Sequence, residues 1–231
     1  MRSKLVIIES GSDASGKETQ TQRLYERLVG DGHRVKKVSF PNYDSDSSAL
    51  IKMYLKGEFG ENPGDVSPYV ASTFYAADRF ASFRSDWGQA YDEGCIILAD
   101  RYTTSNMVHQ AAKIKDHGEK DKFLEWLWDF EFNIYRLPIP DCVLFLDMPP
   151  AYSKILMEDR ANKFTGGKNK DIHERNDQYL IQSYNNSLYI AQKYNWNVIS
   201  CVENGIIKSI GKIHKDIYGV VKKIVLGSKQ E

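Results

Sequence analysis

The stretch G-S-D-A-S-G-K at residues 11–17 decides the fold, because it has the Gly-x4-Gly-Lys spacing of a phosphate-binding loop. A short apolar run, residues 4–9, precedes it, and a segment of helical periodicity, residues 17–29, follows. In such a strand–loop–helix unit the glycines let backbone N–H groups turn inward, the helix N-terminus adds its positive dipole end, and Lys17 adds a full charge. The sequence therefore predicts a nucleotide triphosphate site. A glycine-rich turn without a ligand is the alternative.

The loop departs from the usual pattern directly after its lysine. Ser or Thr normally stands there, and its hydroxyl meets Mg²⁺. In this chain Glu18 takes that place and Thr19 comes one residue later. Glu18 can accept hydrogen bonds from waters on the magnesium, or it can point away along the helix. The predicted nucleotide-binding residues are Gly11, Ser12, Asp13, Ala14, Ser15, Gly16, Lys17, Glu18 and Thr19.

Short apolar runs alternate with helical patterns along the rest of the chain, which is typical of βαβ units around a parallel sheet. Strands are predicted at residues 4–9, 34–40, 95–100, 142–147 and 197–201. Helices are predicted at residues 17–29, 47–56, 68–93, 105–114, 120–135, 150–160, 176–194 and 206–225. Ser67 and Pro68 are expected to cap and open the third helix. Polar residues 161–175 predict a flap, and no linker divides residues 1–231, so we expect one α/β domain.

Composition excludes several classes of function. The 231 residues include 31 basic and 31 acidic ones, so the formal net charge is zero. General affinity for nucleic acid or membrane surfaces needs a net basic field, and no apolar run approaches the length of a membrane span. Cys95, Cys142 and Cys201 lie at the ends of apolar runs and lack metal or redox spacing, which predicts buried thiols in a reducing compartment. We therefore expect a cytoplasmic protein that binds neither nucleic acid nor membranes.

Five short motifs, in order and in register, carry a resemblance to a known family. They are the phosphate loop, F-P-N-Y at 40–43, F-Y-A-A-D-R at 74–79, D-R-Y at 100–102 and D-I-H-E-R at 171–175. Together they resemble the thymidylate kinases over nearly the whole chain. The resemblance implies a P-loop nucleoside-monophosphate-kinase fold, with a five-stranded parallel sheet, helices on both faces and a short flap. It also implies transfer of the γ-phosphate of ATP to dTMP, with Mg²⁺, by a homodimer.

The same resemblance assigns roles in the acceptor site. Arg101, directly after an apolar strand, would hold the acceptor phosphate, and Arg79 would read the thymine edge. A guanidinium suits such tasks because its planar fork binds oxygens in pairs and keeps its charge. Tyr75 matches the aromatic residue on which thymine stacks, although core packing is the alternative for it. The implied acceptor-binding residues are Phe40, Tyr43, Tyr75, Arg79, Arg101, Asn106 and Gln110.

Catalytic charge is expected from the flap. Some family members carry a basic residue inside the phosphate loop, where this chain has Ala14. We expect a flap residue to supply this charge over the phosphates, with Arg160 as the first candidate and Arg175 as the second. The alternative is that the flap is only a solvated, charged loop. Asp13 and Asp100 are the expected carboxylates on the magnesium side, acting through water, unless Asp13 only forms a local turn. The implied catalytic residues are Lys17, Asp13, Arg101, Arg160 and Arg175.

Two other functions stay open at this point. One is a related nucleoside or nucleotide kinase with a different acceptor base. Two residues favour it. His109 stands where some family members have an aromatic residue, and Glu18 departs from the phosphate-loop pattern. The other is a nucleotide-dependent switch without efficient transfer, for which Glu18 is again the reason. Two arginines expected to face inward, Arg101 and Arg79, and a basic flap have no obvious use in a switch.

Overall fold

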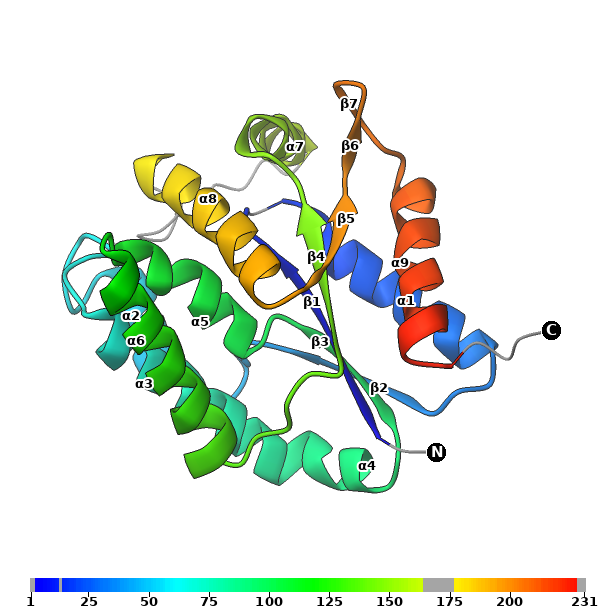
Figure 1. Cartoon of the computed structure of the whole chain (residues 1–231), viewed down its shortest axis with the longest axis horizontal. Helices are drawn as coiled ribbons and strands as arrows, with labels where there is room; N and C mark the ends of the chain where they lie inside the picture. The colour runs from blue at the N-terminus through cyan, green and yellow to red at the C-terminus, as the bar shows by residue number, and fades with distance from the viewer. Residues whose placement is uncertain (1–2, 13, 164–176, 228–231) are drawn as a thin grey trace.

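A five-stranded parallel sheet forms the centre of the molecule, with the strand order β2-β3-β1-β4-β5 (Figure 1). The computed structural model describes residues 3–12, 14–163 and 177–227, without the side chains of residues 158–163 and 177. The strands are β1 (Lys4–Ser10), β2 (Val35–Ser39), β3 (Ile96–Asp100), β4 (Cys142–Asp147) and β5 (Asn197–Ser200). The predicted α/β fold class is confirmed, and each predicted strand lies within two residues of its observed bounds.

Strand β1 is central and sets the register of its neighbours. Ile8 pairs with Asp100 of β3, and Ser10 pairs with Leu146 of β4. All four pairings in the sheet are parallel, so the carboxyl ends of the strands meet at one edge. From Leu5 onward β1 is buried on both sides, which explains why it reads as a continuous apolar run.

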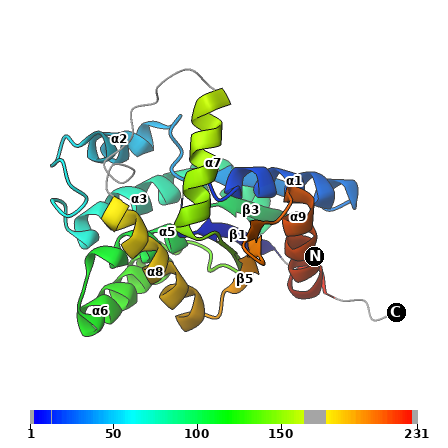
Figure 2. The ribbon, with the colours of Figure 1, turned by 90° about the horizontal axis from the view of Figure 1, so that it is seen from above.

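Helices cover both faces of the sheet (Figure 2). On one face α1 and α9 pack together and bury Leu24, Leu28 and Ile217 against Val6 and Ile8 of β1. The opposite face carries a second apolar cluster, and α5 and α8 pack against each other on that side. The helices are α1 (Lys17–Gly30), α2 (Ala49–Lys56), α3 (Pro68–Ser82), α4 (Gly88–Asp92), α5 (Thr103–His109), α6 (His117–Trp128), α7 (Pro150–Lys163), α8 (Asp177–Lys193) and α9 (Ile210–Ile224).

Two long predicted helices contain a wider π-helical turn. The helix predicted over residues 68–93 is α3, a π-helical segment Phe83–Trp87, and α4. The helix predicted over residues 120–135 is α6 followed by the π-helical segment Asp129–Ile134. Ser67 caps α3 as predicted, because its side chain accepts a hydrogen bond from the Val70 N–H and Pro68 occupies the first turn.

The prediction of one closing helix from residue 206 is wrong at its start. Val202–Glu203 (β6) and Ile206–Ile207 (β7) pair as an antiparallel hairpin, and α9 begins only at Ile210. Asn204 and Gly205 form the turn, both with positive φ, 51° and 75°. An Asn-Gly pair between apolar residues is a strong hairpin indicator that the helical periodicity of the following residues concealed.

Other sequence predictions are confirmed or fall outside the description. Cys95, Cys142 and Cys201 are all buried free thiols. Within the described residues, no helix is long and apolar enough to cross a bilayer. The helix predicted over residues 105–114 starts earlier, at Thr103, and is followed by the 3-10 turn Ala111–Lys113. The flap predicted over residues 161–175 begins inside α7, and its remainder lies outside the described residues.

Lys113 ties the turn after α5 to two other segments. Its ammonium donates to the Tyr54 hydroxyl in α2 at 2.8 Å and to the Val66 carbonyl just before α3 at 3.2 Å. Burial lowers the pKa of Lys113 from 10.5 to about 7, because desolvation disfavours the charged form. The unfolded chain keeps the higher pKa. Below pH 7 the charged side chain therefore lowers the free energy of unfolding by its full desolvation cost. As the pH rises from 7 towards 10.5 the buried side chain is neutral and the free energy of unfolding increases.

Replacing Lys113 with Met should change the pH dependence of stability. The free energy of unfolding of Lys113→Met, relative to the unsubstituted protein, is expected to fall between pH 6 and pH 9 by on the order of 1–2 kcal/mol. The lost hydrogen bonds count equally at both pH values and cancel. Urea unfolding at pH 6 and pH 9 measures the difference, with exposed Lys115→Met as the control. An equal difference at both pH values contradicts the prediction.

Candidate active site

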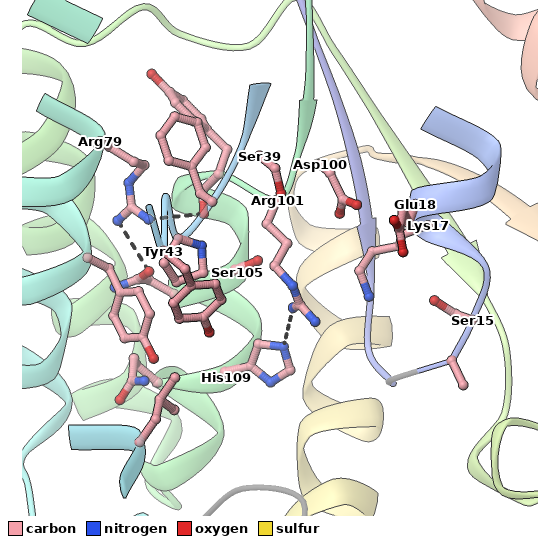
Figure 3. A pocket seen from close by; sticks show the side chains of 18 of the residues that line it. Ser15, Lys17, Glu18, Ser39, Tyr43, Arg79, Asp100, Arg101, Ser105 and His109 are labelled. Carbon is pink, nitrogen blue, oxygen red and sulfur yellow. Dashed lines mark hydrogen bonds between the residues drawn. The ribbon is translucent and has the colours of Figure 1, made fainter. Parts of the chain in front are cut away.

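A pocket of about 380 Å³ opens at the carboxyl edge of the sheet (Figure 3). Its walls come from the phosphate loop, the segments after β2 and β3, and helices α2, α3 and α5. Most residues that the sequence predicted for the donor and acceptor sites meet there. They are Ala14, Ser15, Gly16, Lys17, Glu18, Phe40, Tyr43, Tyr75, Arg79, Asp100, Arg101, Asn106 and Gln110.

Several predicted site residues lie elsewhere or outside the description. Gly11 and Ser12 are buried in the loop behind the pocket, and Thr19 is half-buried on α1. Asp13 and Arg175 belong to the residues that are not described, and Arg160 is described only as a backbone position in α7.

The phosphate loop has the backbone that its sequence predicts. Ala14 and Gly16 adopt left-handed conformations, with φ of 52° and 87°, which alternate the direction of successive peptide groups. Gly16 is the N-cap of α1 and offers no capping side chain, so the first N–H groups of the helix are left for a ligand. This geometry suits an anion at the start of α1.

Ser10, which sequence reasoning missed, organises the charged end of this loop. Its hydroxyl oxygen accepts from the Lys17 ammonium at 2.7 Å and from the Ser15 hydroxyl at 2.8 Å, and it donates to the Ser12 carbonyl at 2.7 Å. Lys17 is buried to 8% exposure. The Ser10 hydroxyl thus helps to hold the lysine inside the site.

Helix α8 packs directly against the loop at Gly11. A Cβ added at Gly11 would lie 2.1 Å from the Ser187 hydroxyl, 2.9 Å from its Cβ and 3.0 Å from the Tyr184 Cα. Ser187 is fully buried, and its hydroxyl donates to the Tyr184 carbonyl. Glycine is therefore required at this position by the close approach of α8.

Gly11→Ala should destabilise the protein by overpacking, by about 2 kcal/mol, and weaken nucleotide binding through displacement of the loop. Adding Ser187→Gly removes the nearest two atoms and should recover more than half of the lost stability. Thermal unfolding and ATP titration of the single and double variants measure both effects. Additive losses in the double variant would show that α8 does not constrain the loop at this contact.

Acidic side chains gather on the side of the pocket nearest Lys17. In Figure 3 the Asp100 and Glu18 carboxylates lie close to Lys17 at the start of α1. Burial raises the pKa of Asp100 above its usual value, with Glu9 and Glu18 adding to the rise, while Lys17 and Arg101 oppose it. Carboxylate oxygens close to a phosphate-binding loop are the donors that a hydrated divalent cation prefers, but the described residues contain no group of three or more Asp, Glu, His or Cys side chains that could hold a metal ion directly.

Arg101 stands at the centre of the pocket, directly after β3, with a left-handed φ of 68°. Its Nη1 lies 3.2 Å from the His109 Nε2, which must act as the acceptor because arginine only donates. The buried Glu9 carboxylate is 3.8 Å from the guanidinium, and its other oxygen accepts from the Thr104 and Ser105 hydroxyls at 2.8 and 2.6 Å. Arg101 is thus held in the pocket next to a buried carboxylate, without the short double contact to that carboxylate that would use up its planar fork.

Arg79 lies at the opposite end of the pocket from Lys17 and is paired differently. Its Nε and Nη2 donate to the two oxygens of Glu131 at 2.8 and 2.5 Å, and both side chains are at most 1% exposed. Nη2 also donates to the Asn106 Oδ1 at 3.2 Å. A buried carboxylate in double contact neutralises the arginine. This end of the pocket is thus polar without net charge.

Two side-chain atoms at this end have no hydrogen-bond partner within the described residues. They are the Asn106 Nδ2, a donor, and the Gln110 Oε1, an acceptor, and both side chains are 2% exposed. Buried polar atoms left unpaired are costly, so their presence in a pocket indicates a ligand that completes them. Phe40 belongs both to the apolar core and to the pocket wall.

The sequence matches a family model described as thymidylate kinase over residues 8–210. This chain belongs to the thymidylate kinase family. It is 27% identical to human thymidylate kinase, covering 94% of this chain and 88% of that one, and 26% identical to the zebrafish (Danio rerio) enzyme, covering 97% and 92%. The probable thymidylate kinase of Pyrococcus horikoshii is 27% identical, covering 98% of this chain and 100% of its own.

Solved thymidylate kinases share the fold. The enzyme from Candida albicans superposes with a TM-score of 0.66 at 22% identity, covering 96% of this chain and 92% of its own. The enzyme from Ehrlichia chaffeensis superposes with a TM-score of 0.63 at 16% identity, covering 96% and 100%. The P-loop nucleoside-monophosphate-kinase fold expected of the family is therefore present in this member.

Proposed function

We propose that this protein transfers the γ-phosphate of ATP to dTMP, producing ADP and dTDP. Family membership supports the reaction class. The observation that supports the acceptor is the placement of two arginines in one pocket: Arg101 lies on the side of the phosphate loop, and Arg79, bound to Glu131, lies at the other end with Asn106 and Gln110. A nucleoside monophosphate likewise has two different ends, with a dianionic phosphate at one end and an uncharged base at the other.

The donor triphosphate is assigned to residues 11–19. The left-handed residues of the loop and the uncapped start of α1 supply N–H groups, and Lys17 supplies the charge. Asp100 and Glu18 would hold Mg²⁺ through water, together with Asp13. When bound, the ion offsets negative charge on the phosphate oxygens.

The base end suits thymine. Its edge presents the O4 keto oxygen, an acceptor, beside the N3–H donor, and the unpaired Asn106 Nδ2 and Gln110 Oε1 offer the complementary pair. Tyr75 and Phe40 provide aromatic walls for stacking. The Arg79 guanidinium contributes as a donor whose charge Glu131 has offset, which an uncharged base requires.

The phosphate end positions the nucleophile. The acceptor phosphate is already ionised, so the reaction needs no proton-abstracting base, only alignment and charge stabilisation. Arg101 binds phosphate oxygens in pairs, with Tyr43 beside it in the pocket. Arg160 and Arg175 are proposed to add charge over the transferred group. Ala14 supports this, because it leaves the phosphate loop without the basic residue that some family members carry there.

We also propose a cytoplasmic homodimer that binds neither nucleic acid nor membranes. Exposed apolar side chains on α3, Val70 at 49% and Phe80 at 41%, support an association surface. The buried free thiols and the zero net charge support a reducing compartment and a small-molecule substrate.

A coupled assay of ADP release with ATP and a panel of nucleoside monophosphates tests the function. Turnover is expected with dTMP at the highest kcat/KM, and it should stop when EDTA removes Mg²⁺. Faster turnover with dCMP or dGMP would support a related kinase with another acceptor. No turnover with any acceptor, although ATP binds, would support a nucleotide-dependent switch.

Arg160→Ala should lower kcat by roughly 10³-fold with little change in the KM for either substrate, because an arginine over the transferred phosphate acts in the transition state. Lys154→Ala, an exposed position on the same helix, is the matched control. Steady-state kinetics with both substrates varied measure the split. A normal kcat in Arg160→Ala would remove that residue from the catalytic set.

A further inference from the structure

Glu131 is a fully buried carboxylate that does not line the pocket. It lies in the π-helical segment after α6, 52 residues along the chain from Arg79. Its oxygens accept from the Arg79 Nε and Nη2, and also from the Thr103 hydroxyl at 2.6 Å. A carboxylate in such a position would be very costly without partners, so the three donors fix its geometry.

This carboxylate fixes the orientation of the whole Arg79 guanidinium. Four of its five N–H groups are used, two on Glu131, one on the Tyr102 carbonyl at 3.3 Å and one on the Asn106 Oδ1 at 3.2 Å. The guanidinium is planar, so once Nε and Nη2 are bound to Glu131, the direction of the second Nη2 hydrogen is determined. That hydrogen points at Asn106.

The Asn106 amide consequently has one permitted orientation. Arginine only donates, so the Asn106 atom that faces Nη2 must be the oxygen. Rotating the amide by half a turn would place its NH₂ group against an arginine N–H, donor against donor. The Nδ2 donor therefore points away from Arg79, and it is buried without a partner among the described residues, in a side chain that lines the pocket.

We propose that Glu131 determines base specificity from outside the pocket, by holding Asn106 through Arg79 so that a donor faces the base edge. A donor at that point binds a keto oxygen, as in thymine, and opposes an amino group, as in cytosine. The Gln110 amide is not fixed in this way, because its Oε1 has no hydrogen-bond partner among the described residues. The inference rests on the proposed function, since it assigns a determinant to the same acceptor site.

Glu131→Gln tests the proposal. A glutamine accepts at one oxygen only, and its NH₂ group meets a donor, so Arg79 loses a bond and its counter-charge and no longer fixes Asn106. The kcat/KM for dTMP should fall at least tenfold through KM, and the preference for dTMP over dCMP should fall by at least the same factor. The kcat for dTMP should stay within about threefold, because Arg101 and the donor site are untouched.

Glu131→Asp keeps the charge but is one methylene shorter, so it should fold readily and lose an intermediate part of the preference. Lys120→Met is the control for destabilisation alone, since Lys120 on α6 is buried and donates to the Asn186 Oδ1 at 3.0 Å, away from the pocket. It should lower the thermal midpoint without changing the preference. Thermal unfolding establishes which variants are folded.

Three outcomes separate the claims. The proposal is supported if folded Glu131→Gln loses the preference for dTMP over dCMP while Lys120→Met keeps it. If Glu131→Gln does not fold, Glu131→Asp takes its place in this comparison. An unchanged dTMP-to-dCMP ratio in a folded Glu131 variant overturns it, as does a loss confined to kcat. Absence of dTMP turnover in the unsubstituted protein would instead refute the proposed function, independently of Glu131.

Discussion

The parallel pairing of β1 with β3 and β4 is the constraint on which the site depends. With Ile8 opposite Asp100 and Ser10 opposite Leu146, the strands end at the same edge, and the segments that follow them open into one pocket. The phosphate loop after β1 and Arg101 after β3 thereby become neighbours although 84 residues separate Lys17 from Arg101 in the chain. This is the general position of ligand sites in open α/β sheets.

Two buried carboxylates then give the pocket its polarity. Glu131 contacts Arg79 with both oxygens and offsets its charge, whereas Glu9 lies 3.8 Å from Arg101 and accepts hydrogen bonds from the Ser10 N–H and from the Thr104 and Ser105 hydroxyls. Because charges act strongly in a partly desolvated cleft, we propose that this difference contributes to what each arginine binds. In the proposed function one arginine is a hydrogen-bond donor for an uncharged base, and the other binds a phosphate.

Sequence reasoning succeeded where the controlling interactions are local. The phosphate loop, the five strands and the Ser67 cap each follow from residues close together in the chain. It missed Glu131, because the role of that residue arises from contacts with segments far away in the chain. It also missed Glu9 and Ser10, because polar residues at this point of the sequence resemble the end of a strand. The Asn204-Gly205 turn was readable from sequence, but the periodicity of α9 extended the helix too far. Roles of Asp13, Arg160 and Arg175 stay predictions.

The central claim is that Arg101 serves the phosphate and Arg79 serves the base. Calorimetric titration of dTMP and of thymidine, which lacks the phosphate, into Arg101→Met and Arg79→Met tests it most directly, with exposed Arg84→Met as the control. Arg101→Met should weaken dTMP binding by at least tenfold and leave thymidine binding unchanged, whereas Arg79→Met should weaken both ligands by a similar factor. If Arg79→Met weakened dTMP alone, both arginines would serve the phosphate and the division of the pocket would be contradicted.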